Sequence, residues 1–353
     1  KLTSASISSG FVKATPQRDN GFVFNLTLSQ NFWQETRSLS EMKPPFEFRP
    51  DTDYDVAGFG TNAVDHLIGV AEYPAFNSKV ELTNWQILPG GEVASTLVAL
   101  QRLDFKTAYA GRFGSDEAGK LGLRSLVDEG INVDHAEVVS DARTQVAFII
   151  VDERTGERTI IWKRDPKLRY SPDNAPLELG CSAKILHMTP HDTAAAIRMA
   201  GAARDAATIV SLDIDNTFDG LDDLLALTDI MIASSDLLER LTGTRDKLSA
   251  MTGVASRYGC RIVGVTLGDE GSNLLCDGVF IDTPAFEVPG GCVDTTGAGD
   301  AFRAGFLYGL LSGYDVERAG RSANAVAALE CRKIGARAAL PDLRELTTLL
   351  KIR

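Results

Sequence analysis

Past a polar N-terminal stretch, the hydrophobic and polar positions of the chain follow two repeating patterns. Short apolar runs rich in β-branched residues predict buried strands, and apolar residues that recur every three or four positions predict helices. In the first half, these patterns predict strands at 56–59 and 107–110 and a helix at 91–103. A second helix is predicted over 115–130, with Ser115 as its N-cap.

Two β-rich runs in the middle of the chain, 146–151 and 158–163, predict a hairpin. Beyond it, predicted strands and helices alternate, which is typical of a parallel sheet covered by helices on both faces. The sequence therefore predicts an α/β fold with three layers. Ligands of such sheets bind beyond the C-terminal ends of the strands, where Asp213, Ser234 and Thr266 fall. The later predicted strands are 184–188, 208–213, 229–233 and 260–266.

Three segments depart from this alternation. The stretches 66–88 and 143–165 are β-rich, and they predict a small second sheet that acts as a lid. Residues 1–50 show no sustained period and are interpreted as an extension of unknown role. The regular domain is therefore expected to span 51–353.

Composition narrows the classes of partner. The net charge of −12 argues against general binding to nucleic acid or to anionic membranes. The chain contains no apolar run of about 18 residues or more, so no transmembrane helix is expected. Its 5 cysteines form no CxxC pair, which indicates reduced thiols and a cytoplasmic location.

The most informative motif is Asp294-Thr295-Thr296-Gly297-Ala298-Gly299-Asp300, which opens an apolar helical pattern. Small residues at 297–299 allow a ligand to approach the backbone closely, and the free N–H groups of a helix start favour an anion. Asp300 places a carboxylate in the same turn. A base beside an anion-binding turn suits transfer of a phosphoryl group to a hydroxyl.

Two other glycine motifs suggest different chemistry. Gly58-x-Gly60 follows a strand and fits a dinucleotide fingerprint, but the sequence turns at Tyr73-Pro74 before a long crossover helix could form. The segment 114–121 nearly spells a phosphate-binding P-loop, yet Leu121 stands where the metal-binding hydroxyl should be. Both motifs are incomplete, but Gly58-x-Gly60 keeps an NAD-dependent dehydrogenase as one alternative.

The heptapeptide resembles the C-terminal signature of the ribokinase/PfkB family of carbohydrate kinases, and Gly90-Gly91 resembles the glycine pair of its N-terminal signature. The stretches 109–119 and 335–337 are also similar to the family, and the likeness covers about 53–345. It implies a ribokinase-like three-layer sandwich with a β-sheet lid, and ATP-dependent phosphorylation of a sugar or a sugar-like molecule.

The resemblance implies a role for each matching residue. Asp300 would be the general base, and the amides of Gly297, Ala298 and Gly299 would form the anion hole. The sugar would be bound by Asp65, Gly90 and Gly91. Asp192 is either a second sugar ligand or the N-cap of a helix.

The nucleotide site is implied in the same way. Thr266, Gly268 and Gly271 match the family's nucleotide loop, and Asn324 would lie beside the adenine. The cofactors would be ATP and Mg²⁺, with K⁺ as a further candidate because Asp294 is near the family's monovalent-cation site. A homodimer joined through the lids is a family-level expectation.

Two departures from the family pattern leave alternatives open. Ser234 and Leu237 replace the N-x-x-E motif that helps to hold Mg²⁺, so a catalytically weak sugar or nucleotide sensor is one alternative and a nucleoside kinase, such as an adenosine kinase, is another. Glu92 stands where ribokinase-like members tend to carry Lys, which changes the substrate preference. A basic cluster after the hairpin is either a solvated edge or a contact to an anionic substrate: Lys163, Arg164, Lys167 and Arg169.

Overall fold

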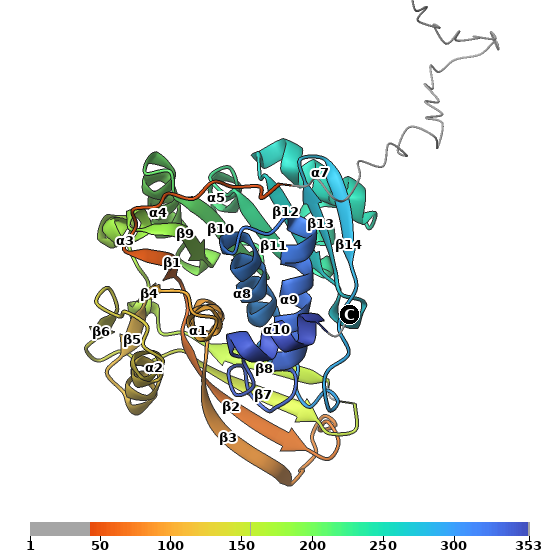
Figure 1. The fold of residues 1–353 in the computed structure, drawn as a ribbon. Coiled ribbons are helices and arrows are strands. Elements are labelled where there is room, and N and C mark those ends of the chain that lie inside the picture. Colours follow the sequence, from red (N-terminus) through yellow and green to blue (C-terminus); the bar gives the residue numbers. More distant parts are fainter. Residues whose placement is uncertain (1–42, 156, 352–353) are drawn as a thin grey trace, which may run out of the picture. The chain divides into compact units, whose positions relative to one another are not determined.

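The structure of the chain is a computed structural model that describes residues 43–155 and 157–351 (Figure 1). Most of the predicted extension lies outside these residues. Its last part, 43–50, belongs to the same compact unit as the rest of the chain, which begins at Met42. Phe46 is buried in the core, and Arg49 donates hydrogen bonds to the carbonyls of Cys181 and Ala183.

An eight-stranded sheet forms the centre of the molecule, in the order β14-β13-β12-β11-β10-β9-β1-β4. The strands from β4 to β12 in this order are parallel, and β13 and β14 are antiparallel to their neighbours. The predicted parallel sheet is therefore confirmed. Its strands are β1 Tyr54–Phe59, β4 Thr107–Ala110, β9 Ala183–Met188, β10 Ile209–Ile214, β11 Ile230–Ser234, β12 Ile262–Thr266, β13 Ser272–Cys276 and β14 Val279–Thr283.

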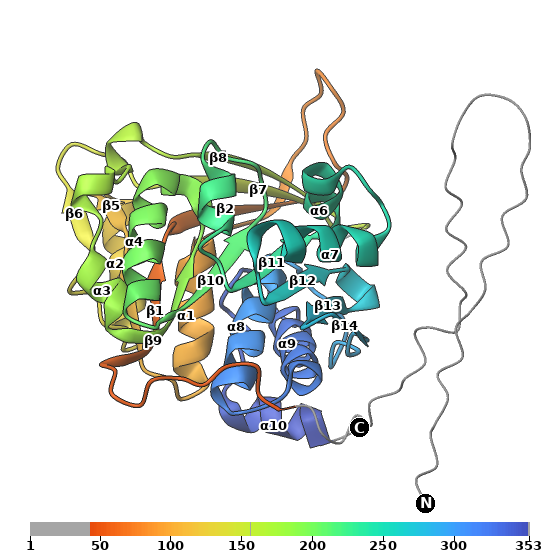
Figure 2. The same cartoon turned by 90° about the horizontal axis from the view of Figure 1, so that it is seen from above.

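Helices cover both faces of this sheet (Figure 2). Side chains of a strand point alternately to opposite faces, so Ile230 and Ile232 of β11 join one apolar core and Met231 and Ala233 join the other. The first core packs against α1 Glu92–Arg102, α8 Ala298–Leu311, α9 Val316–Glu330 and α10 Leu343–Lys351. On the opposite face lie α3 Leu177–Cys181, α4 Thr193–Asp205, α5 Leu221–Leu225, α6 Ser235–Thr242 and α7 Lys247–Tyr258.

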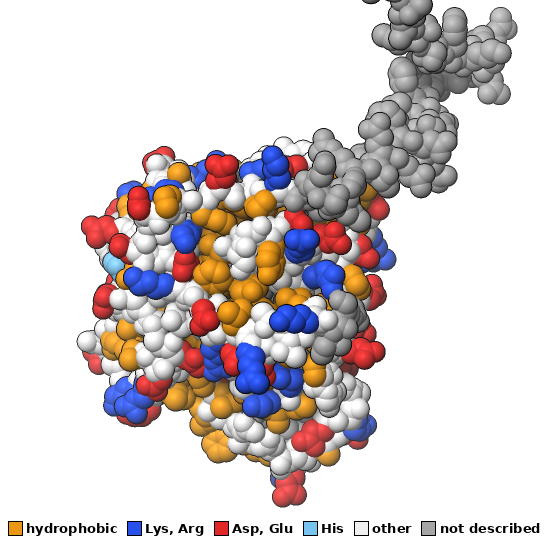
Figure 3. Space-filling model, in the orientation of Figure 1, with side chains coloured by type: hydrophobic (Ala, Val, Ile, Leu, Met, Phe, Trp, Pro, Cys, Tyr) orange, Lys and Arg blue, Asp and Glu red, His pale blue; other side chains and the backbone are white. Residues whose placement is uncertain are grey.

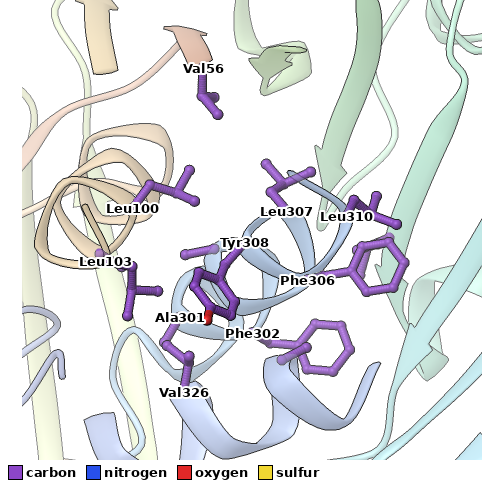
Figure 4. Packing of buried hydrophobic residues seen from close by; sticks show 14 of the residues in the cluster. Val56, Leu100, Leu103, Ala301, Phe302, Phe306, Leu307, Tyr308, Leu310 and Val326 are labelled. Atoms are coloured by element: carbon purple, nitrogen blue, oxygen red, sulfur yellow. The ribbon is translucent and has the colours of Figure 1, made fainter. Parts of the chain in front are cut away.

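Helix α8 lies at the centre of the first core, between α1 and α9 (Figure 4). Its Phe302 and Phe306 point into the apolar cluster together with Val326 of α9 (Figure 4). A Cβ at Gly305 would lie 2.7 Å from the Cα of Ala323, and this bare backbone allows the two helices to approach closely. The packing fixes the start of α8, which carries the predicted anion turn.

The predicted second sheet is also present, and it has four strands in the order β3-β2-β7-β8. Leu67 and Ile149 point from its inner face into a small apolar cluster, to which Leu88 and Ile334 also belong. Whether this sheet moves as a lid stays a prediction. Its strands are β2 Ala63–Val70, β3 Leu82–Gly90, β7 Val146–Asp152 and β8 Arg158–Lys163.

The remaining elements form a small lobe beside the sheets. Strands β5 Arg112–Gly114 and β6 Glu137–Val139 pair in parallel, and α2 Glu117–Asp128 packs against β5. The N-cap of α2 is Asp116, not the predicted Ser115, because the Asp116 carboxylate accepts the amide of Gly119 at 3.0 Å. Short 3₁₀ turns lie at Pro166–Leu168, Pro172–Asn174, Pro190–Asp192 and Gly268–Glu270.

Two alternative readings of the glycine motifs are wrong. Strand β1 runs directly into β2 at Ala63, so no helix follows Gly58 and Gly60 to bind a dinucleotide. At the second motif, the carboxylate of Asp116 occupies the helix start where a P-loop would bind phosphate. Among the helices of the described residues, none is long and apolar enough to cross a bilayer.

Candidate active site

The predicted anion turn forms the start of α8. Gly297 is the N-cap with φ +86°, and a Cβ there would lie 2.6 Å from the Cα of Ala336, so only glycine fits. The amide of Ala298 donates to the carbonyl of Thr295 at 3.2 Å. Within the described residues, the amides of Gly297, Gly299 and Asp300 have no protein acceptor. The free donors are therefore those at 297, 299 and 300 rather than the predicted three at 297–299.

Asp300 follows this turn and is half-buried among other charged groups. Burial raises the pKa of its carboxyl well above the usual range, and the carboxylates of Asp213 and Glu92 raise it further. Arg303 acts in the opposite direction. Thr96 of α1 donates to the Asp300 carbonyl at 3.2 Å. A carboxylate in this environment takes up a proton more readily than one in water, as a general base requires.

Arg303 and Asp213 form a buried ion pair beside Asp300, with 2.5 Å between Nη2 and Oδ1. Arg303 also donates to the carbonyl of Ile232 at 3.2 Å. Burial raises the pKa of Asp213, whereas the guanidinium of Arg303 lowers it, and the short contact between them supports the charged pair. Arg303 was not predicted as a site residue, although it is the single charged residue between Ala301 and Leu311. A lone charge in so apolar a helix indicates a buried partner.

Asp65, Gly90 and Gly91 lie close together where β2 and β3 pair, and their binding of a sugar stays a prediction. Burial raises the pKa of Asp65 to about 6, and the nearby guanidinium of Arg337 opposes this rise. Arg337 donates to the carbonyl of Gly90 and, at 3.0 Å, to Oγ of Ser95. The charge of Asp65 also contributes to the raised pKa of Asp300, after burial and the carboxylates of Asp213 and Glu92.

The carboxylate of Asp192 is held by Arg164, whose Nη1 and Nη2 donate to its two oxygens at 2.9 and 2.7 Å. Asp192 stands at the N-cap position of α4, but its side chain makes no capping hydrogen bond. Asp192 is therefore the N-cap of α4 by position only, and sugar binding by its carboxylate stays a prediction. Arg164 does not lie on a solvated edge, because its side chain is almost buried.

Glu92 is the first residue of α1, immediately after Gly91. Its Oε2 accepts the hydroxyl of Thr61 at 2.8 Å and lies 3.7 Å from Nδ1 of His191. Burial raises the pKa of Glu92 to about 7, and the carboxylate of Asp215 is the next largest cause. Glu92 therefore adds a further acidic group near Asp300.

The predicted nucleotide residues lie at the far end of the main sheet. Gly268 and Gly271 have φ values of +63° and +100°, and they close the loop that follows Thr266 at the end of β12. Asn324 of α9 is buried, and its Nδ2 donates to the carbonyl of Thr283 at 3.0 Å. Asn324 thus ties α9 to β14, and its contact with adenine stays a prediction.

Asp294 acts as a structural clasp. Its Oδ1 accepts the amide of Thr296 at 2.9 Å and its Oδ2 accepts the amide of Gly335 at 2.8 Å. No cluster of three His, Cys, Asp or Glu side chains able to hold a metal exists in the part of the chain that the structure describes.

Ser234 stands where the family motif N-x-x-E would begin, and it caps α6 by accepting the amide of Leu237 at 3.4 Å. The place of the missing N-x-x-E motif is thus a helix cap.

The second sheet contacts the anion turn through Arg158, the first residue of β8. Its Nη1 donates to Oγ1 of Thr295, two residues before Gly297. A cavity of about 650 Å³ lies beside this contact. Its wall includes Tyr73, Asp152, Thr155, Glu157, Arg158, Thr159, Ile160 and Thr295. The second sheet therefore reaches the segment that leads into the turn at the start of α8.

The fold and these groups together define a phosphotransferase of the α/β class. The chain belongs to the pfkB family of carbohydrate kinases, whose model matches residues 59–343. It is therefore an ATP-dependent sugar kinase, as the sequence predicted.

Several known proteins are similar to most of the chain. It is 28% identical over 300 residues to a nucleoside kinase of Methanothermobacter thermautotrophicus. The matched region covers 83% of this chain and 94% of the relative. It is 30% identical over 279 residues to an ATP-dependent ribose-1-phosphate kinase of Halopiger xanaduensis, covering 78% and 91%. The solved Arabidopsis thaliana ribokinase with ribose and ATP has a TM-score of 0.72 and 26% identity, covering 84% of this chain and 99% of that chain.

Proposed function

We propose that the protein transfers the γ-phosphoryl group of ATP to a hydroxyl of a sugar, with Asp300 as general base. One observation carries the proposal: the Asp300 carboxylate and the free amides of Gly297, Gly299 and Asp300 lie in a single helix turn. Asp65 and the bare backbone of Gly90 and Gly91 would bind the sugar beside this turn. Asp192 would add a contact from the other side.

In the reaction, Asp300 accepts the proton of the sugar hydroxyl while the oxygen of that hydroxyl forms a bond to the γ-phosphorus of ATP. The bond from that phosphorus to the β-phosphate oxygen breaks, and ADP leaves. The free amides stabilise the negative charge on the transferring group. A general base accounts for about 10²–10⁴ in rate. Positioning of hydroxyl and phosphate under the second sheet supplies a further large part.

The residues present fit ATP in two places. The unpaired amides of Gly297, Gly299 and Asp300 would bind its phosphates, and the glycine loop at 268–271 would leave room for the nucleotide to approach the backbone. Mg²⁺ would be held by the phosphates and water, where it would neutralise charge. A neighbour of the same fold from Escherichia coli, at 21% identity, was solved with ATP and Mg²⁺. The proposal of a K⁺ ion near Asp294 is based only on the position of the motif. The structure adds no support for it, because both carboxylate oxygens of Asp294 already accept backbone amides.

Replacement of Asp300 tests the proposal. ADP release is measured against a panel of free sugars, phosphorylated sugars and nucleosides, for the wild type and for Asp300→Asn. We expect turnover to fall by about two orders of magnitude or more with an unchanged melting temperature. Activity of Asp300→Asn within about tenfold of the wild type would remove Asp300 as the base.

The same panel separates the alternatives. A sensor would bind one compound tightly and release no ADP with any of them. A nucleoside kinase would turn over nucleosides in preference to sugars, which the 28% identical nucleoside kinase makes worth testing. A cytoplasmic location stays a prediction, for which the five free thiols are the support.

We further propose that two copies of the chain associate through the outer face of the second sheet. Ile87, His66, Phe148 and Ile161 are directly opposed across its four strands and therefore share one face. Trp85 stacks on His66 and is 59% exposed. Figure 3 shows hydrophobic side chains at the lower part of the molecule, where this sheet lies in Figure 1.

An exposed apolar face of this kind marks an interaction site. Light scattering on a sizing column should give the mass of a dimer for the wild type. Phe148→Glu should give a monomer, since a charge at the centre of an apolar interface is costly. A monomeric wild type at high concentration would contradict the dimer and leave the kinase proposal intact.

A further inference from the structure

Two cysteines lie next to the segment that leads into the anion turn. The amides of Val293 and Asp294 both donate to the carbonyl of Cys331, at 2.8 and 3.4 Å. Cys292 directly precedes Val293, so the peptide bond that follows Cys292 is hydrogen-bonded to the backbone of Cys331. The two cysteines are therefore neighbours in space, although α8 and α9 lie between them in the sequence.

The side chains of these two cysteines contact each other as well. Burial raises the pKa of the Cys331 thiol to about 12, and the charge of Glu330 and a hydrogen bond with the Cys292 thiol contribute after it. A disulfide forms between residues whose backbones are adjacent and whose thiols face each other. Cys292 and Cys331 have both adjacent backbones and thiols in contact.

The remaining three cysteines are not arranged in this way. Cys260 and Cys276 belong to the two opposite apolar cores of the main sheet, so the sheet separates their side chains. The thiol of Cys181 donates to a backbone carbonyl at 3.4 Å. Among the described residues, which include all five cysteines, Cys292 and Cys331 are thus the pair suited to a disulfide.

The two thiols of the pair differ in their access to solvent. Cys292 is exposed, whereas Cys331 is only 7% exposed. An oxidant in solution therefore meets Cys292 first and reaches Cys331 through it. An accessible thiol beside a second, less accessible one is typical of cysteines that are oxidised in two steps to a disulfide.

The thiol pair is also close to the candidate active site. The carboxylate of Asp294, two residues after Cys292, accepts one amide of its own segment and one of the loop after α9. Glu330 directly precedes Cys331, and its pKa is raised to about 9 by burial and then by the charges of Asp294 and Asp300. A movement of the thiols is therefore passed to Asp294 over two residues of backbone.

We propose that Cys292 and Cys331 form a reversible oxidation site, at which hydrogen peroxide joins the two thiols in a disulfide and thereby slows phosphoryl transfer. The loss of activity rests on the proposed kinase function, whereas the covalent modification does not. In the resting protein all five thiols are free. A thiol reductant would return the oxidised protein to that state.

The modification proceeds in two steps. The Cys292 thiolate attacks one oxygen of the peroxide, so that an S–O bond forms, the O–O bond breaks, and the departing hydroxide becomes water by taking up the thiol proton. The sulfur of Cys331 then attacks the sulfur of this sulfenic acid, the S–O bond breaks, and a second water leaves with the proton of Cys331. In total, two thiols lose two electrons and two protons, and one peroxide becomes two molecules of water.

The disulfide would displace the segment before the anion turn. Two sulfur atoms in contact must approach to about 2.05 Å to be bonded, so the backbone at Cys292 moves towards the end of α9. Asp294 moves with it, and the course of the turn changes. A misplacement of about 1 Å costs up to about 100-fold in rate. We therefore expect the kcat of the oxidised protein to be lower by a factor of about 10 or more.

Oxidation of the 353-residue chain tests the modification. Reduced protein is treated with a small excess of hydrogen peroxide, the remaining free thiols are blocked, and the intact mass and the disulfide-linked tryptic peptides are measured. We expect a loss of two hydrogen atoms and a link between Cys292 and Cys331. Fragment spectra distinguish Cys292 from Cys276, because both lie in the tryptic peptide that ends at Arg303. Dithiothreitol should restore both the starting mass and the rate of ADP release.

Three variants assign the steps to the two thiols. Cys292→Ser should form no disulfide and should keep its rate of ADP release after peroxide treatment. Cys331→Ala should stop at the sulfenic acid, which dimedone labels at Cys292. Cys181→Ser is the matched control, because it removes a half-buried thiol outside the pair and should be oxidised and slowed like the wild type. Melting temperatures check that each variant is folded.

Two results would overturn the inference. One is a peroxide-treated wild type without a link between Cys292 and Cys331. The other is a linked protein that releases ADP as fast as the reduced one. Failure of the kinase proposal is distinct, because the reduced protein would then release no ADP with any acceptor while its mass would still reveal the disulfide. In that case calorimetry with ATP decides the effect on the turn, and equal affinity of the reduced and oxidised protein would contradict it.

Discussion

A Cβ on residue 90 would lie 1.9 Å from Oδ2 of Asp65, so the carboxylate of Asp65 occupies the space that any larger residue at position 90 would need. The absence of a side chain at Gly90 therefore leaves the space in which the carboxylate of Asp65 lies. This explains physically why the glycine and the aspartate occur together although they belong to different strands.

Gly90→Ala should displace the Asp65 carboxylate. We expect KM for the sugar to rise by about 10-fold to 100-fold, since small misplacements at a site are costly. KM for ATP should change little. Steady-state kinetics with both substrates measure the effect. Gly201→Ala is the matched control, because no atom lies within 4 Å of the added methyl. That variant should be more stable by about 0.5–1 kcal/mol, with unchanged kinetics.

Arg303→Met should leave Asp213 buried without its partner. We expect the free energy of unfolding to fall by about 3–5 kcal/mol, as measured by urea denaturation. The double variant Arg303→Met with Asp213→Leu removes both charges and should recover most of this loss. Its activity should remain low, because Asp300 has lost both neighbours. Equal destabilisation of the single and double variants would contradict a paired role.

Acid should unfold the protein partly through His187. This residue is fully buried, Ser211 Oγ lies 3.1 Å from its Nδ1, and burial lowers its pKa to about 3. The unfolded chain, with a pKa near 6.5, binds the proton more readily, so stability falls as the pH falls below about 6.5. Urea denaturation at pH 7.5 and 5.5 should show a loss of about 1.4 kcal/mol from this group. The variant His187→Asn should lack that part of the pH dependence, since all other groups are unchanged.

Arg158→Ala should remove the contact between the second sheet and Thr295. We expect kcat/KM for ATP to fall by about tenfold, consistent with the loss of a charge-assisted hydrogen bond near the phosphates. Arg154→Ala is the control, because Arg154 lies in the same sheet but pairs with Glu72 and Asp152 and not with Thr295. If both variants behave alike, the contact with Thr295 has no part in catalysis.

Much of the fold follows from the sequence because its signals are local. Strand β4 has its predicted bounds, since a buried parallel strand is a short apolar run with clear ends. The turn at 297–299 was predictable because glycine and a following apolar helix are adjacent in the chain. The start of α2 was misplaced by one residue because Ser115 and Asp116 both cap helices well.

The arrangement around Asp300 was harder to predict. The pair of Arg303 with Asp213 and the position of Arg337 depend on packing between distant segments. The apolar surroundings of Arg303 in the sequence indicate a buried partner but do not identify Asp213, and no local pattern marks Arg337. The engaged state of Ala298 is equally a matter of geometry, because only the course of the turn decides which amides remain free.

Asp65, which would bind the sugar, and Asp300, the proposed base, lie on different sheets of the same domain. Asp65 belongs to β2 of the second sheet, whereas Asp300 belongs to α8, which packs on the eight-stranded sheet. A sugar that contacts both residues would connect the two sheets. For the phosphorylated sugar to leave, the two sheets would then have to move apart. We therefore expect product escape and opening of the small sheet to be a single event, with a rate that depends on solvent viscosity.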